Sequence, residues 1–231
     1  MSGKAAQTRT PRLQRSRSNR IASGGPFSGS PSPANLAAFI ASGPTLLDIE
    51  TTGLKADYGL VLVIGTRRFT PSGPSAPTRR FAVDIRELDM ERSERRALSA
   101  FRAFMAGKDA VITFNGVRFD VPYLQARLAI QGLPMLPKLR HLDLFFAVKH
   151  TFGYTVASRR ARYIESLFRV GDPDAPLKDG SQIMTWSHAT YSRNRAAFRR
   201  IIEHNEHECL DSLQYQTRRL MALLPRSVSL K

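Results

Sequence analysis

The stretch that decides the fold is Asp48-Ile49-Glu50-Thr51-Thr52-Gly53-Leu54, at the end of an apolar segment that reads as a buried strand over Thr45–Glu50. Residues two apart on a strand point to the same side, so Asp48 and Glu50 share one face. Two adjacent buried carboxylates repel each other and lose hydration, so folding gains little from them unless a cation lies between them. Oxygen ligands suit Mg²⁺ or Mn²⁺. An isolated Asp-x-Glu would equally fit a structure in which one carboxylate caps the next turn and the other reaches solvent. The surrounding sequence therefore has to distinguish a metal site from this alternative.

A second polar motif lies about seventy residues further on and reads Asn115-Gly116-Val117-Arg118-Phe119-Asp120. It follows an apolar segment, Asp109–Phe114, that predicts a strand, and it precedes a predicted helix at Pro122–Gln131. Asp120 would therefore lie near a helix N-terminus, where negative charge is favoured. Taken alone, the motif would equally fit an Asn-Gly turn with a helix-capping Asp.

A third cluster reads His204-Asn205-Glu206-His207-Glu208-Cys209-Leu210-Asp211, within a long helix predicted from about Arg193 to Leu223. Positions 204, 208 and 211 of a regular α-helix share one face. Both Glu208 and Asp211 could then approach the carboxylates of the first motif. A solvated, charge-rich helix surface is the alternative interpretation of this cluster.

The first two motifs resemble those of the DEDD 3′–5′ exonucleases, the DnaQ-like branch of the RNase H-like superfamily. The resemblance covers roughly residues 43–223 and implies an α/β fold, an RNase H-like mixed β-sheet flanked by helices. In that family the last carboxylate follows a Tyr by four residues or a His by five. Cys209 occupies the position five after His204, so we expect Glu208 as the fourth acid, with Asp211 as the alternative. The segment also resembles the Tyr-Asn-x-x-Asp motif of a bacterial and archaeal branch of predicted exonucleases.

The resemblance implies two Mg²⁺ or Mn²⁺ ions and a phosphodiester hydrolase that acts at the 3′ end of single-stranded DNA or RNA. It assigns metal binding and catalysis to the acidic residues Asp48, Glu50, Asp120 and Glu208 (or Asp211), and water activation to His204. It assigns contacts with the terminal nucleotide to Thr51, Thr52, Leu54, Asn115 and Phe119. Asp143 is predicted to cap the following helix. A catalytically inactive nucleic-acid-binding module on the same fold is the chief alternative function.

The charge of the chain supports a nucleic-acid partner. The 231 residues carry a net charge of +16, with a pI of about 11.0, which favours a polyanion. A ribosome-associated protein would also fit this charge. Residues 1–33 contain six basic and no acidic residues, so +10 remains on residues 34–231, the predicted exonuclease domain. The Ser-, Pro- and Arg-rich composition of residues 1–33 predicts a disordered tail, either a nucleic-acid-binding arm or a solvated leader, with an organellar transit peptide as a third alternative.

The chain has a single cysteine, Cys209, so it forms no intrachain disulfide. We therefore expect an intracellular, cytoplasmic location, with a nucleoid-associated or an organellar location as alternatives. No apolar run suits a bilayer. Trp186 falls in a stretch for which we predict no regular structure. The remaining predicted elements are a helix at Ala34–Ala41, strands at Leu60–Phe69 and Arg79–Asp84, a helix at Glu91–Met105, a strand at His141–Leu144 that could instead begin a helix at Leu144–His150, and an amphipathic segment at Arg160–Arg169. Candidates for phosphate contacts are Arg67, Arg68, Arg79, Arg80, Arg118, Arg159 and Arg160.

Overall fold

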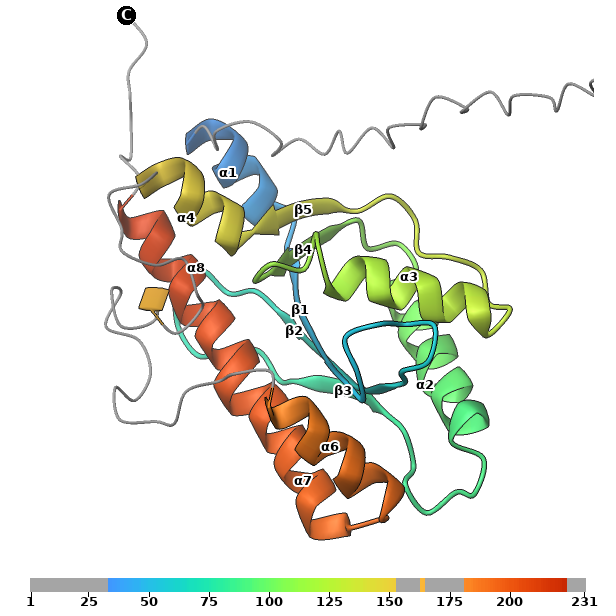
Figure 1. The fold of residues 1–231 in the computed structure, drawn as a ribbon. Helices are drawn as coiled ribbons and strands as arrows, with labels where there is room; N and C mark the ends of the chain where they lie inside the picture. The colour runs from blue at the N-terminus through green and yellow to red at the C-terminus, as the bar shows by residue number, and fades with distance from the viewer. Residues whose placement is uncertain (1–32, 153–162, 165–180, 224–231) are drawn as a thin grey trace, which may run out of the picture.

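The computed structural model describes residues 33–152, 163–164 and 181–223 (Figure 1). The predictions for the N-terminal tail, for most of Arg160–Arg169 and for Arg159 and Arg160 lie outside these residues. Within them, no helix is long and apolar enough to cross a membrane.

A five-stranded mixed sheet forms the centre of the domain, in the order β3-β2-β1-β4-β5. Its central strand is β1 (Thr45–Thr51), which pairs antiparallel with β2 (Val61–Arg68), and β2 pairs antiparallel with β3 (Arg79–Ala82). On the other side, β1 runs parallel to β4 (Ala110–Thr113), and β4 runs parallel to β5 (Arg140–Asp143). This arrangement confirms the predicted α/β class with a mixed sheet.

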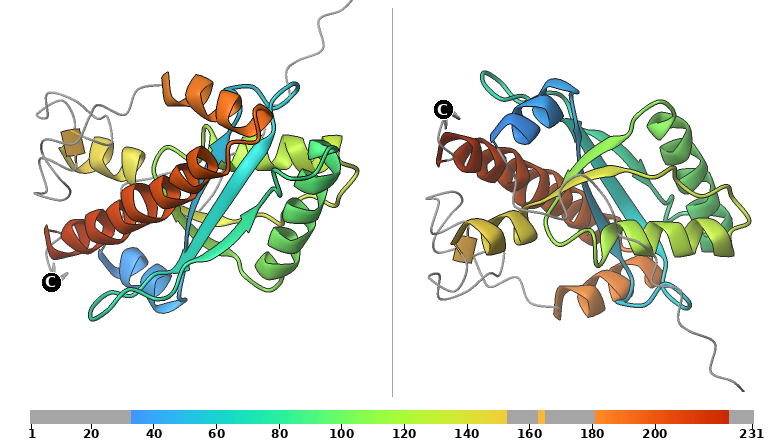
Figure 2. Two further views of the ribbon diagram at one scale, coloured as in Figure 1. Left: turned by 90° about the horizontal axis from the view of Figure 1, so that it is seen from below. Right: turned by 90° about the horizontal axis from the view of Figure 1, so that it is seen from above.

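Helices cover both faces of this sheet, as the two further views show (Figure 2). One face packs against α2 (Met90–Met105) and α3 (Asp120–Ile130). The other face carries a continuous helix made of α7 (Arg195–Glu203), the π-helix η1 (His204–Leu210) and α8 (Asp211–Leu223). The described residues also form the helices α1 (Pro33–Ala41), α4 (Leu144–Phe152) and α6 (Ser181–Tyr191).

The alternation of β1 explains why its two faces differ. Leu47 and Ile49 join the core against α2 and α3. Leu46 joins the opposite core, beneath α8, and because side chains alternate along a strand, Asp48 and Glu50 continue on that same face. The two predicted metal ligands therefore lie toward the C-terminal helix.

A buried ion pair ties the loop after β1 to the helices on the first face. Glu94 of α2 accepts hydrogen bonds from the Val61 amide and from Arg127 Nε of α3, both at 2.8 Å. Arg127 Nη1 then donates to the Ala56 carbonyl oxygen at 2.9 Å. Breaking one partner of such a pair leaves a buried charge without compensation, at a cost of about 3–5 kcal/mol. This network therefore holds residues 52–60 in place next to the sheet.

One stretch that was predicted to lack regular structure is helical. Trp186 lies in α6, a helix that the sequence does not predict because Ser181–Tyr191 has only a weak separation of apolar and polar residues. Tertiary packing stabilises this helix instead, since Trp186 and Ala189 contact the core that also contains Phe198 and Ile201.

A candidate metal centre beneath the C-terminal helix

Asp48 and Glu50 lie against the π-helix η1. Asn205 Nδ2 donates to Asp48 Oδ2 at 2.8 Å and to the Asp48 carbonyl oxygen at 3.3 Å. The Glu50 side chain is buried, with His204 Nε2 and Cys209 Sγ each 3.9 Å from its Oε1 atom. The pairing of β1 with β2 shifts by one residue between Glu50 and Thr51. Such bulges re-aim side chains and are frequent next to active sites.

Gly65 on β2 makes the contact between Asn205 and Asp48 possible. It lies opposite Asp48 in the strand register. A Cβ atom at this position would lie 1.8 Å from Asn205 Oδ1, so any larger residue would occupy the space of the amide. Asn205 is fully buried, and its Oδ1 atom has no hydrogen-bond donor among the residues that the structure describes.

Asp120 brings a further carboxylate close to Asp48. It begins α3, as its position after the second motif predicted, and its Oδ1 atom accepts a hydrogen bond from the Ile49 amide at 3.1 Å. Burial raises the pKa of Asp120 well above its ordinary value, and the negative charge of nearby Asp48 raises it further. A cation between Asp48 and Asp120 would offset both effects, so this pair fits a divalent metal, and Glu50 lies on the same face of β1 as Asp48.

The π-helix changes which late residues reach this group. A π-helix bonds residues five apart, so residues 204 and 209 come to lie one above the other. His204 and Cys209 accordingly both face Glu50. Glu208 instead lies with its Oε2 atom 3.1 Å from His204 Nδ1, and its side chain is half exposed. The regular α-helix assumed from the sequence would have placed residues 204 and 208 on the face of the acids.

Asp211, the alternative fourth carboxylate, contacts β2. It forms an ion pair with the buried Arg67, and its Oδ2 atom lies 3.4 Å from His207 Nδ1. Arg67 also donates to Thr78 Oγ1, from Nη2 at 2.8 Å. These contacts give Asp211 a structural role at the junction of η1, α8 and the sheet.

The second motif is held by Asp143 at the end of β5. The amides of Asn115 and Val117 donate to its two carboxylate oxygens at 2.8 and 3.0 Å. Asn115 adopts a φ of 61°, a conformation that Asn tolerates better than most residues. The Phe145 amide donates to Asp143 Oδ1 at 3.0 Å, which confirms the predicted cap of α4. Burial raises the pKa of Asp143, and these backbone donors limit the rise.

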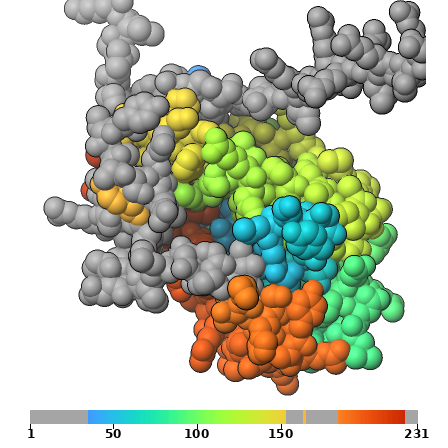
Figure 3. All heavy atoms as spheres, in the orientation of Figure 1, coloured from blue at the N-terminus to red at the C-terminus, as the bar shows by residue number. Residues whose placement is uncertain are grey.

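The residues expected to contact a terminal nucleotide lie on two neighbouring loops. Thr51 Oγ1 donates to the Gly53 carbonyl oxygen, and Thr52 Oγ1 accepts from the Leu60 amide, each at 2.8 Å, so both hydroxyls shape the loop after β1. Leu54 is 67% exposed. Figure 3 shows this loop, in cyan, standing out between the second-motif loop and α6. Phe119 packs on Tyr123 with ring centroids 5.4 Å apart.

The sequence model described as the RNase H superfamily matches residues 45–218, more than half of the chain. The chain belongs to the RNase H superfamily.

Solved structures with the same fold include the family B DNA polymerase from the archaeon Pyrobaculum calidifontis, at a TM-score of 0.55 and 17% identity, over 77% of this chain and 24% of the polymerase. E. coli exonuclease I in complex with an oligonucleotide matches at a TM-score of 0.40 and 13% identity, over 70% of this chain and 43% of the other. The chain thus spans about a quarter of the polymerase and less than half of exonuclease I. A search of curated proteins found no match.

Three residues at this RNase H-like site were not assigned a role from the sequence. Asn205 holds Asp48, Cys209 faces Glu50, and Trp186 packs against His204 with ring centroids 5.0 Å apart. Asn205 and Cys209 stand within the third motif, so their neighbourhood was a usable signal. For Trp186 the sequence holds no such signal, because its contact depends on how α6 folds back.

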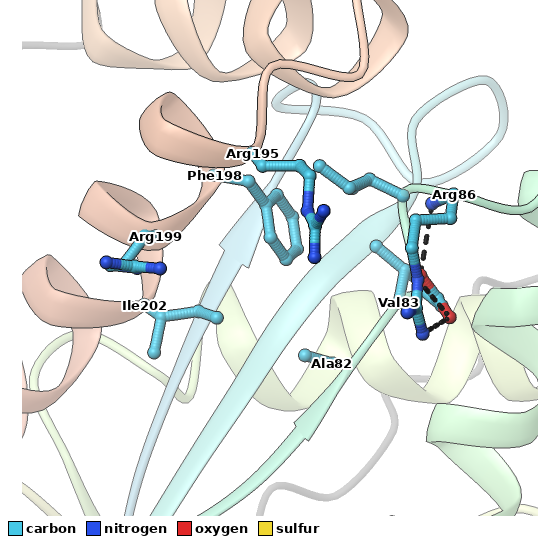
Figure 4. Close-up of a pocket in the computed structure, with 9 residues that line it drawn as sticks. Ala82, Val83, Arg86, Arg195, Phe198, Arg199 and Ile202 are labelled. Atoms are coloured by element: carbon cyan, nitrogen blue, oxygen red, sulfur yellow. Dashed lines mark hydrogen bonds and ion pairs between the residues drawn. The ribbon is translucent and has the colours of Figure 1, made fainter.

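An arginine-lined hollow of about 430 Å³ lies elsewhere on the RNase H-like domain, between the end of β3 and α7 (Figure 4). Arg86, Arg195 and Arg199 line it, with Phe198 at its wall. Asp84 is bound to Arg86, which leaves a local excess of positive charge. None of these arginines was among the predicted phosphate contacts.

The predicted phosphate contacts lie in different environments. Arg67 is buried in its pair with Asp211, Arg80 pairs with Glu206 at 3.0 Å, and the Arg79 guanidinium lies over the Phe104 ring. Arg118 is exposed beside the second motif and lies 5.0 Å from the Phe146 ring centroid. Of these four arginines, Arg118 is the one best placed to meet a substrate near the carboxylates.

Proposed function

We propose that this chain is a divalent-metal-dependent 3′–5′ exonuclease of the DEDD type that acts on single-stranded DNA or RNA. The observations that carry the proposal are that Asp48 and Glu50 share the face of β1 below η1, that Asp120 lies close enough to Asp48 to feel its charge, and that His204 lies beside Glu50. The RNase H-like fold supports nuclease-type function in general terms, and a family B DNA polymerase shares it. The finer assignment rests on the two motifs and on the carboxylate geometry.

Mg²⁺ or Mn²⁺ ions would be held by the three carboxylates, and when bound they would acidify a water molecule and stabilise the leaving oxygen. Asn205 fixes the Asp48 carboxylate through its hydrogen bond at 2.8 Å. The Ile49 amide similarly orients Asp120. Both contacts reduce the motion of ligands that have to be positioned within about 0.5 Å.

His204 is placed to move a proton. Its Nδ1 atom lies 3.1 Å from Glu208 Oε2, so a proton on Nδ1 is held there by the carboxylate. Nε2 then keeps a lone pair on the side of Glu50, from which it can accept a proton from an attacking water molecule. Trp186 packs against the imidazole and limits its rotation. Glu208 would therefore act by orienting His204.

The substrate would approach across the loops that follow β1 and β4. Thr51, Thr52, Leu54, Asn115 and Phe119 would surround the 3′ nucleotide. The excess of basic residues, +10 over residues 34–231, would attract the phosphate backbone. The arginine-lined hollow is a candidate path for that backbone, because Arg199 and Arg195 precede His204 by about 7 and 14 Å along the helix axis.

A second candidate function is nucleic-acid binding without cleavage. The observation that favours it concerns the two candidates for the fourth acidic ligand: Glu208 contacts His204, and Asp211 contacts Arg67. The side chain that faces Glu50 is that of Cys209. A displacement of about an ångström in a catalytic group can cost about a hundredfold in rate.

Carboxylate variants separate the two functions. Wild type and Asp48→Asn should be compared on 3′-labelled single-stranded DNA and RNA with Mg²⁺ and with Mn²⁺. We expect metal-dependent release of label by the wild type and a loss of at least a hundredfold in Asp48→Asn, with binding retained. Glu91→Gln, an exposed change on α2, is the control and should keep wild-type activity. Tight binding with no cleavage by the wild type would support the non-catalytic function.

A further inference from the structure

We propose that Glu50, His204 and Cys209 form a site for one thiophilic divalent cation, Zn²⁺ in the first instance, at the edge of the carboxylate group. The three residues come from β1 and from the two ends of the π-helix. One ligand atom of each can be chosen so that all three lie within 4.8 Å of one another.

The distances suit a small tetrahedral ion. Zn–N and Zn–O bonds of about 2.0–2.2 Å and Zn–S bonds of about 2.3 Å imply ligand atoms roughly 3.3–3.7 Å apart. The Glu50 Oε1 atom lies 3.9 Å from both His204 Nε2 and Cys209 Sγ. Two of the three pairs therefore need to close by only a few tenths of an ångström, which side-chain rotation supplies.

The chemistry of the donors favours zinc over magnesium. A thiolate, an imidazole nitrogen and a carboxylate oxygen are the ligands that Zn²⁺ takes in proteins, whereas Mg²⁺ prefers oxygen ligands alone. Cys209 stands five residues after His204, and the π-helix brings its sulfur to the same Glu50 oxygen that His204 faces. The chain thus offers a sulfur ligand here, which Zn²⁺ accepts and Mg²⁺ does not favour.

The neighbours of His204 are arranged as they are around metal-bound histidines. Such a histidine holds its other ring N–H on a carboxylate, which fixes the tautomer that binds the ion. Glu208 lies 3.1 Å from Nδ1, so Nε2 is the nitrogen that faces Glu50 and Cys209. Glu50 and His204 are also largely buried, which strengthens their interaction with a cation.

A consequence follows for the proposed nuclease, and it rests on the proposed function. Zn²⁺ at this site would engage Glu50 and the Nε2 lone pair of His204, the groups that the hydrolytic reaction needs. Zn²⁺ should therefore inhibit Mg²⁺-dependent cleavage, and a chelator selective for zinc should restore it.

Binding is tested without any nuclease assay, on the full chain, with Co²⁺ as a spectroscopic probe and Zn²⁺ as its competitor. Cys209 is the single cysteine of the sequence, so a thiolate-to-cobalt charge-transfer band can arise from this residue alone. We expect the band to appear, to saturate at one Co²⁺ per chain, and to be lost when Zn²⁺ is added. Cys209→Ser should abolish the band and weaken Zn²⁺ binding at least tenfold.

His207→Gln is the matched control, because His207 lies on the same π-helix but is exposed, and it should leave the band and the affinity unchanged. Co²⁺ binding without a thiolate band, or Zn²⁺ binding that Cys209→Ser leaves unchanged, would overturn the site. The band in a chain that cleaves nothing would uphold the site and count against the nuclease alone. Zn²⁺ bound at Cys209 with undiminished cleavage would overturn the inhibitory role.

Discussion

Replacing Gly65 with alanine should displace Asn205 from Asp48. The added Cβ atom would lie 1.8 Å from Asn205 Oδ1, closer than atoms can approach, and in a tight contact of 3.0 Å with Leu210 Cδ1. Asn205 is fully buried, and its short side chain is bonded to Asp48 at 2.8 Å, so the clash can be relieved only by breaking that hydrogen bond.

The expected cost has two parts. Overpacking a well-packed interior costs about 1–3 kcal/mol, and losing a hydrogen bond to a charged group costs about 1.5–3 kcal/mol. Gly65→Ala should therefore lower the free energy of unfolding, measured by urea denaturation, by roughly 3–5 kcal/mol. Gly53→Ala is the control, because a Cβ atom there would meet nothing within 4 Å. It should stay within about 0.5 kcal/mol of wild type.

A double-mutant cycle isolates the contact. In an Asn205→Ala background the amide is gone, so Gly65→Ala should cost less than about 1 kcal/mol, since alanine also restricts the unfolded chain. The coupling energy between the two positions should then be at least about 2 kcal/mol. An equal cost of Gly65→Ala in both backgrounds would refute the steric argument.

Three further predictions concern charge. Asp120→Asn keeps an acceptor for the Ile49 amide but removes a buried charge beside Asp48, so it should raise the melting temperature measured without metal. The same change should abolish cleavage and the stabilisation by metal. A lower melting temperature without metal would contradict this prediction. Burial lowers the pKa of His141 to about 4. The unfolded chain then takes up a proton at about pH 6.5 and the folded chain only near pH 4, so the free energy of unfolding should fall by up to about 3 kcal/mol as the pH is lowered from 6.5 to 4. His141→Gln should make this fall smaller when unfolding is measured as a function of pH. Replacing Arg195 and Arg199 with glutamine should weaken binding of single-stranded DNA and lower the salt slope of log K by about 0.7 per lost phosphate contact; an unchanged slope would exclude this surface.

The fold and the first carboxylates could be predicted from short-range patterns. The alternation at Asp48 and Glu50 set their common face, and the position of Asp120 after an Asn-Gly turn set its place at a helix N-terminus. Asp143 could be predicted as a cap because the residue type and the strand–helix junction coincide. Each of these features depends on only a few consecutive residues, which is why the sequence sufficed.

The late helix could not be predicted in the same detail. The positions of Glu208 and Cys209 depend on a π-helix, whose extra residue per turn leaves no clear mark in the sequence. The role of Gly65 depends on the register between β1 and β2, and that of Trp186 on the packing of α6. These are long-range effects, and the fourth acidic ligand stays a prediction.

The most direct test of the proposed function is a time course on 5′-labelled single-stranded DNA and RNA with Mg²⁺ or Mn²⁺, resolved at single-nucleotide spacing. A metal-dependent 3′–5′ exonuclease should give a ladder that shortens from the 3′ end one nucleotide at a time, with nucleoside 5′-monophosphates as products and no reaction in a chelator. Intact substrate with either metal, or cuts at internal positions from the first time points, would contradict it.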